Sequence, residues 1–199
     1  MARVTSANAN SVGAFHFSNN PEIYEIQRGN NFEFIVTDLD NLRRAGTDGS
    51  ESDSKLENPQ EYLRLSVASA SVPHYSQNAI EVKRGNTTIK YAGVMSFPSG
   101  SIEVYDFIGA RTKDILMAWQ NLSGDIKKET VGLQASYKKQ CQLIEYSPDY
   151  NQKVRTWILE GCWVSNISEG NYDQNNNDSR RISATIEYDK AYVDTSELI

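Results

Sequence analysis

The chain has 199 residues, of which 39% are hydrophobic and 23% are charged. This composition is ordinary for a globular protein and predicts a packed core in a single domain spanning residues 1–199. The formal net charge is −6, which disfavours tight sequence-independent binding of nucleic acid, because such binding needs clustered Lys and Arg. No segment has the length of a membrane span and the N-terminus lacks a signal-peptide pattern, so we expect the chain to stay in the cytoplasm where it is made.

The first part of the chain predicts one strand between two irregular segments. Residues 1–31 are rich in Asn, Ser and Gly and predict an N-terminal arm that becomes ordered only when something docks on it. The apolar run Phe32–Thr37 predicts the first strand. Residues 41–61 form a long polar loop that is either flexible or functional, because ordinary connections are much shorter.

The next two segments predict strands. Leu63, Leu65 and Val67 alternate with polar residues, so Tyr62–Val72 is predicted as a half-buried strand that ends at Pro73. Two alternating runs then flank Gly85-Asn86, which is typical of a two-residue hairpin turn. This register gives two apolar pairs and one pair of opposite charges: Val82 with Ile89, Ile80 with Tyr91, and Glu81 with Lys90.

One helix is predicted, at about residues 112–123, after a strand at Ser101–Phe107. Thr112 is the predicted N-cap, Asp114 lies in the first turn and Gly124 follows the end. Ile115, Trp119 and Leu122 recur at helical spacing, which predicts that one face packs on a sheet.

The last third of the chain returns to strands. Residues 182–188 alternate strictly between apolar and polar side chains. Val154–Ile167 carries apolar residues on both faces, with Cys162 on one and Leu159 on the other, which predicts a strand covered on both sides. The whole pattern predicts a mainly β fold, an antiparallel barrel or sandwich with one flanking helix and a β core at residues 62–192.

Residues that could carry chemistry are few. His16 and His74 lie in separate segments without metal-ligand spacing, and Asp173 begins a calcium-loop-like run that lacks the required glycine and glutamate. Cys141 and Cys162 are expected to be free thiols. No phosphate-binding or nucleophile motif occurs, so we expect no catalytic residue, no metal and no cofactor.

The C-terminal block resembles a known family. A Tyr-Ser-Pro-Asp turn is followed by an Arg-x-Trp strand, a Gly-x-Trp step, an Asp-containing loop and a closing strand of the Arg-x-Ile-Ser-Ala-Thr-Ile pattern. The matching residues are Tyr146–Asp149, Arg155, Trp157, Gly161, Trp163, Asp173 and Arg181–Ala191. This order resembles the tail tube proteins of contractile-tailed bacteriophages, and weaker matches extend the resemblance to about residues 60–192.

The resemblance implies a structural virion protein that is not an enzyme. Hexameric rings would stack into the hollow inner tube of the tail, assembled in the host cytoplasm, and genomic DNA would pass through the lumen without specific binding. The implied partners are further copies of the chain, the tail sheath protein, and baseplate, tape-measure and tail terminator proteins.

The polar loop is where we expect contacts between subunits or between rings, because an unpaired stretch of this length is usually functional or disordered. The candidate contact residues are Arg43, Arg44, Asp48, Glu51, Asp53 and Lys55.

Two alternatives remain open. The tube of a contractile bacterial secretion or toxin-injection system shares the architecture implied by the resemblance. A β-sandwich that binds carbohydrate would instead expose Trp119, Trp157 and Trp163 as a stacking platform. We favour these three tryptophans, together with Ile186, as anchors of the core.

Overall fold

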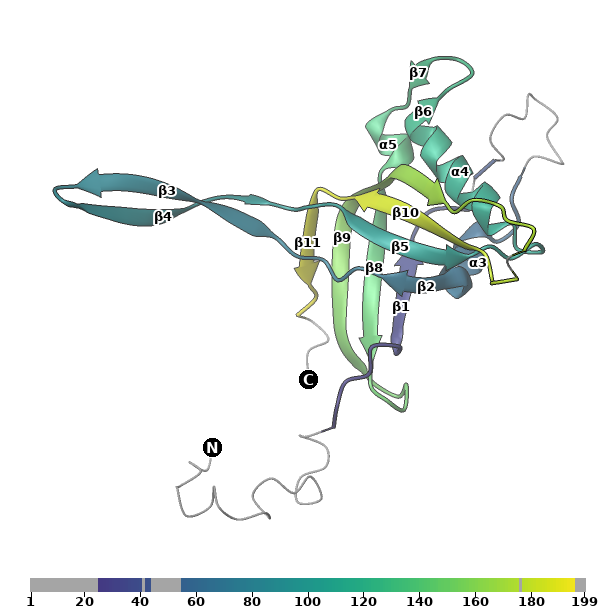
Figure 1. Cartoon of the computed structure of the whole chain (residues 1–199), viewed down its shortest axis with the longest axis horizontal. Helices are drawn as coiled ribbons and strands as arrows, with labels where there is room; N and C mark the ends of the chain where they lie inside the picture. Colours follow the sequence, from purple (N-terminus) through teal and green to yellow (C-terminus); the bar gives the residue numbers. More distant parts are fainter. Residues whose placement is uncertain (1–24, 41, 44–54, 176, 196–199) are drawn as a thin grey trace, which may run out of the picture.

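The computed structural model describes residues 25–40, 42–43, 55–175 and 177–195. Its body is built from antiparallel strands that form two sheets crossing each other, with helices at one side (Figure 1). The first sheet contains β1 (Phe32–Val36), β8 (Lys139–Tyr146), the first half of β9 (Lys153–Glu169) and β11 (Lys190–Val193). The second sheet contains the other half of β9, β10 (Arg181–Glu187), β5 (Gly100–Tyr105) and β2 (Val67–Ala70). The mainly β fold predicted from the sequence is therefore confirmed.

Strand β9 joins the two sheets and changes phase at a bulge. Leu159 pairs with Cys141 of β8, whereas Cys162 pairs with Lys139, so β9 has one residue more than its partner in between. Gly161 lies in this bulge with φ +72°, a conformation that favours glycine. Leu159 and Cys162 consequently both point into the core. The sequence analysis placed these two residues on opposite faces, which is wrong because a regular alternation cannot represent the bulge.

The core lies between the two sheets and the longest helix. It includes buried side chains from β1, β5, β8, β9 and β10, with Tyr188 at its border. Cys141 and Cys162 are free thiols within this core, as expected. Burial raises the pKa of the Cys141 thiol well above its usual range, and a hydrogen bond with Cys162 adds to the effect.

Helix α4 (Thr112–Ser123) closes one side of the core. Ile115, Leu116 and Trp119 are fully buried, and the indole of Trp119 donates to the carbonyl of Tyr137 at 3.1 Å. The N-cap is Arg111, with φ 50°, and not Thr112 as predicted. Thr112 lies inside the first turn, where its buried hydroxyl is 3.0 Å from that of Ser66. The Thr112 hydroxyl, which was predicted to cap the helix, thus makes a tertiary hydrogen bond with Ser66 instead.

Helix α3 (Pro59–Ser66) occupies a segment predicted as a strand. Pro59, Leu63 and Ser66 are buried at helical spacing, whereas Leu65 is 64% exposed. The strand β2 begins only at Val67. The apolar alternation was too short to distinguish the period of a strand from that of a helix. Pro59 in the first turn favours a helix, because a backbone N–H at that position would have no partner within the helix.

The remaining described elements are small or stand apart from the body. They are β6 (Gly124–Asp125), β7 (Thr130–Val131), α5 (Gln134–Tyr137), and the hairpin strands β3 (Ser76–Arg84) and β4 (Thr87–Ser96). Three helices are thus present in the described residues, where the sequence predicted one. None of the described helices is long and apolar enough to cross a membrane.

Candidate assembly surfaces

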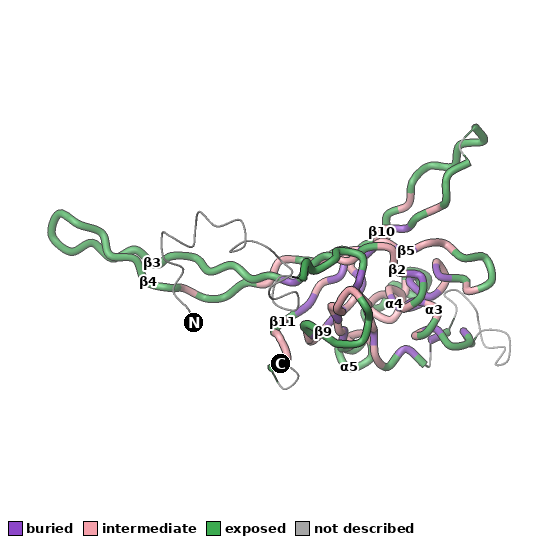
Figure 2. The backbone as a smooth tube through the Cα atoms, turned by 90° about the horizontal axis from the view of Figure 1, so that it is seen from below, coloured by how far each residue is buried: buried purple, intermediate pink, exposed green. Residues whose placement is uncertain are grey.

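The β3–β4 hairpin projects far from the body, as the extension of the β2–β5 pair (Figure 1). Its strands pair only with each other among the described residues. Every residue of β3 and β4 is exposed except Gly93, which is half-buried (Figure 2). A hairpin of this length without tertiary cover is marginally stable in water at best.

The register of the hairpin is the one predicted from the sequence. The turn is formed at Gly85 with φ +61°. The observed cross-strand pairs are Val82 with Ile89, Ile80 with Tyr91, and Glu81 with Lys90. The charged pair is an ion pair with an N–O distance of 3.2 Å.

The register gives the hairpin two unlike faces. Because side chains alternate along each strand, Ile80 and Val82 share a face with Ile89 and Tyr91, and Glu81 and Lys90 lie on the other. The four apolar side chains, from 39% exposed for Ile89 to 55% for Ile80, form a continuous patch. We call this patch the apolar face of the hairpin. Exposed apolar patches of this kind mark contact sites for other molecules.

A bulge near the root of the hairpin depends on Gly93. The register shifts between Gln77 and Ala79, opposite the Ala92–Met95 stretch. A Cβ at Gly93 would lie 2.4 Å from the backbone oxygen of Asn78. Only glycine permits this close approach of the two backbones, so Gly93 allows the bulge to form.

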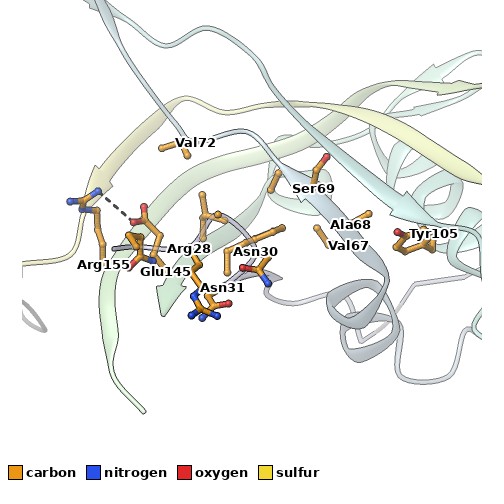
Figure 3. A pocket seen from close by; sticks show the side chains of 15 residues that line it. Arg28, Asn30, Asn31, Val67, Ala68, Ser69, Val72, Tyr105, Glu145 and Arg155 are labelled. Carbon is orange, nitrogen blue, oxygen red and sulfur yellow. Dashed lines mark ion pairs between the residues drawn. The ribbon is translucent and has the colours of Figure 1, made fainter. Parts of the chain in front are cut away.

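An open groove of about 730 Å³ lies between the edges of the two sheets (Figure 3). Residues 27–32, which lead into β1, form one wall, and β2 with Val72 forms the other. Leu143 contributes to the lining, and an ion pair between Arg155 and Glu145, with an N–O distance of 3.5 Å, lies at one end. We call this hollow the β1–β2 groove. Its volume is in the range of binding pockets for organic groups.

In the two main sheets, β1, β2 and β11 each leave an edge without a strand partner among the described residues. β1 and β2 end the path of the main sheets, and β11 pairs only with β9. Such edges carry backbone N–H and C=O groups that can pair with another chain. The β1–β2 groove runs between two of them.

A cluster of charges ties the β9–β10 connection to the start of α4. Glu169 accepts from Lys113 at 3.0 Å and also from Arg180, whose guanidinium lies 3.8 Å above the Tyr172 ring. The hydrogen bond from Lys113, and next that from Arg180, lowers the pKa of Glu169. These ion pairs link the end of β9 and the β9–β10 connection to the first turn of α4.

Of the six loop residues expected at contacts, two are described. Arg43 and Lys55 form an isolated antiparallel bridge, which closes the base of the loop. The other four, Arg44, Asp48, Glu51 and Asp53, lie outside the described residues.

The residues expected as core anchors have different environments. Trp119 and Ile186 are buried in the core. Trp157 is half-buried and donates its indole N–H to Glu145 at 3.0 Å, and Trp163 packs edge-on against the Tyr137 ring at 5.9 Å between centroids. Since Trp119 is fully buried, the three tryptophans cannot form one exposed platform for a sugar.

The described residues contain no group of three or more His, Cys, Asp or Glu side chains arranged to hold a metal ion. In the loop that partly copies a calcium site, the Asp173 carboxylate accepts from the backbone N–H of Asn175 at 3.0 Å. This is the ordinary hydrogen bond of a polar turn.

Sequence reasoning located the hairpin but assigned it no role. A signal was available, because a strand pair with one apolar face needs a cover and no neighbouring segment was predicted to supply it. The β1–β2 groove had no comparable signal, since its walls come from segments far apart in the chain.

Comparisons with known proteins give matches at the level of structure. No family model matches the sequence, and no curated protein matches it. A chain of the sheath–tube complex of an extracellular contractile injection system, in the extended state, superposes with a TM-score of 0.60 at 17% identity, over 90% of this chain and 97% of that one. A chain from the structure of the tube-terminating cap of the anti-feeding prophage superposes with a TM-score of 0.60 at 15% identity, over 96% of this chain and 99% of that one. A chain from the structure of the sheath/tube terminator of an extracellular contractile injection system has a TM-score of 0.59 at 18% identity, over 86% of this chain and 98% of that one. The chain therefore has the fold found in the tube assemblies of contractile injection systems, in agreement with its sequence resemblance to tail tube proteins.

Proposed function

We propose that this protein is a structural subunit of a contractile-system tube, in which rings of identical copies stack into a hollow cylinder. The observation that carries the proposal is the β3–β4 hairpin, whose apolar face has no cover in a single copy. The fold of the tube assemblies, matched over nearly the whole of both chains, supports the same role.

Ring formation is explained by the free edges of the first sheet. β1 and β11 end this sheet on opposite sides and run in opposite directions, since each successive pair from β1 through β8 and β9 to β11 is antiparallel. The β11 edge of one copy and the β1 edge of the next can therefore join as a further antiparallel pair. Repetition of this contact closes a ring, and the sequence resemblance favours six copies.

The role of the lumen follows from the proposal. In the phage form of the tube, genomic DNA passes through it into the host, and the net charge of −6 keeps phosphate from condensing on the wall. In the injection-system form, the same tube would deliver a toxin. Both forms are non-enzymatic parts of an assembled particle and share a surrounding sheath, a baseplate and a terminator as partners.

Electron microscopy of the purified protein tests the proposal. We expect hollow rings or tubes of uniform width, with a high-mass species in size-exclusion chromatography that grows with protein concentration. The matched control is a variant in which residues 77–95 are replaced by a short turn, which removes the hairpin and leaves the body intact. A wild-type protein that stays monomeric at every concentration, also when baseplates are added as seeds, would contradict the proposal.

A further inference from the structure

We propose that β11 of one copy adds to β1 of the next copy in one particular register, with Ala191 opposite Phe34 and Val193 opposite Phe32. This inference rests on the proposed function, which joins the two edges, and it names the residues that meet there. The register carries β11 into the β1–β2 groove, whose lining includes Phe32 at the start of β1. A second copy is then the occupant of the groove.

The two faces of the first sheet restrict the register. On β1, Phe34 packs in the core and Glu33 lies on the opposite face, where it accepts from the Tyr146 hydroxyl at 2.9 Å. On β11, Ala191 packs against the core and Tyr192 lies on the opposite face. A joined sheet keeps one apolar face only if the core-facing residues of β11 lie opposite the core-facing residues of β1. Every second register is thereby excluded.

The backbone groups at the two free edges lead to the same restriction. Thr37 donates its backbone N–H to a carbonyl of β8 at 2.9 Å. Because these groups alternate in direction along an antiparallel strand, those of Phe34 point to the free edge. On the other side, Asp194 donates its N–H to a carbonyl of β9 at 2.8 Å, so the groups of Val193 point to the free edge. In both strands, the residues that can pair at the edge are therefore the core-facing ones.

A shift of two residues in one direction removes the partner of Val193. The shift would place Val193 opposite Asn30, which precedes β1. Asn30 lies in a turn that is closed by a hydrogen bond from the Asn31 N–H to the Arg28 carbonyl at 3.3 Å. A residue in such a turn does not continue a strand ladder, so this register loses a pair.

A shift of two residues in the other direction brings like charges together. It would place Asp194 opposite Glu33, and like charges that face each other destabilise a strand pair. The proposed register instead places Tyr192 opposite Glu33 and Lys190 diagonally next to it, within reach of the carboxylate. All four residues of β11 then pair with residues of β1.

The groove suits this occupant at both of its walls. Val193, opposite Phe32, would lie against the apolar part of the lining, which includes Leu143. Asp194 follows β11 and would lie opposite Asn31, at the polar wall that also contains Arg28 (Figure 3). The apolar residue thus meets apolar groups, and the carboxylate meets a wall with an amide and a cation.

Paired cysteines test the register. In the proposed joint, Glu33→Cys and Tyr192→Cys place two thiols directly opposite each other. Within one copy these positions are three strand spacings apart, at least about 14 Å, too far for a disulfide, so links form only between copies. After electron microscopy has shown tubes, oxidation by oxygen with copper phenanthroline is expected to give a ladder of linked copies in non-reducing electrophoresis. The matched control, Ile35→Cys with Tyr192→Cys, is shifted by two residues and should give few links.

A second pair makes the test independent of Glu33, which also contacts Arg64. Lys190→Cys with Ile35→Cys reports the same register and should give the same ladder. Tubes that link through the shifted pair would overturn the register and leave the tube function standing. Tubes in which none of the pairs links would overturn the joint between β11 and β1, and this inference with it. A wild-type protein that never assembles would overturn the proposed function as well.

Discussion

At the scale of single residues, Gly161 sets the geometry on which both sheets depend. Its φ of +72° forms the bulge in β9, and a Cβ there would meet the Asp189 carboxylate at 2.3 Å. We expect Gly161→Ala to lower the free energy of unfolding by about 1–2 kcal/mol, because a side chain in this conformation is strained. Urea unfolding measures the change. Gly170→Ala is the matched control, since a Cβ at Gly170 meets nothing within 4 Å. Equal stability of the two variants would show that the bulge imposes no strain.

Glu169 gives the protein a pH dependence of known sign. Its pKa is lowered by hydrogen bonds, first from Lys113 and then from Arg180, and its side chain is 21% exposed. A carboxylate with a depressed pKa stabilises the fold above its unfolded pKa, and this contribution is lost as the pH falls through the folded pKa. We expect Glu169→Gln to lower the unfolding free energy by about 1 kcal/mol at neutral pH and by progressively less in acid.

Thermal unfolding across a pH series checks this expectation. Glu57→Gln, the same change at an exposed position on the segment before α3, is the matched control. A constant difference between wild type and Glu169→Gln from neutral to acid pH would contradict an ionised Glu169 as the source of the stabilisation.

At the scale of elements, α3 shows how tertiary packing decides between two periods. Leu63 is 1% exposed and Leu65 is 64% exposed. A helix places these two residues on different faces, whereas the predicted strand would place both on the same face. We expect Leu63→Ala to cost about 2–5 kcal/mol of unfolding free energy, through lost burial and a cavity. Leu65→Ala, the same change two residues away, should cost little. Similar losses in both variants would favour the strand and contradict the helix.

The elements also show what the sequence could and could not predict. The β3–β4 register was predictable because a glycine turn and alternating residues fix it locally. The phase change in β9 was not, because an alternation pattern contains no bulge until a partner strand reveals it. The β1–β2 groove was equally hidden, since residues 27–32, β2 and β8 meet only in the folded chain.

At the scale of the whole molecule, a single copy of the chain has two unlike parts, a packed body and an exposed hairpin. A body with a hydrophobic core carries a long hairpin whose residues are nearly all exposed (Figure 2). A groove lined in part by Val72 opens beside the root of that hairpin. The hydrophobic core lies in the body and includes no residue of β3 or β4. In the proposed tube a second copy covers the hairpin, so its exposed apolar face favours assembly.

This asymmetry predicts how defective copies act on assembly. A copy with Ile80→Ser and Ile89→Ser loses the apolar face of the hairpin and keeps the rest of its surface, so in the proposed tube it can accept the hairpin of a neighbour and cannot donate its own. Mixed with wild type in rising proportion, it should terminate growth and shorten the assemblies, because each heterologous contact requires a donor and an acceptor. Length distributions in electron micrographs measure this effect, and Glu81→Ser with Lys90→Ser on the opposite face is the matched control. Assemblies of unchanged length with the apolar-face variant would mean that growth does not proceed through the hairpin.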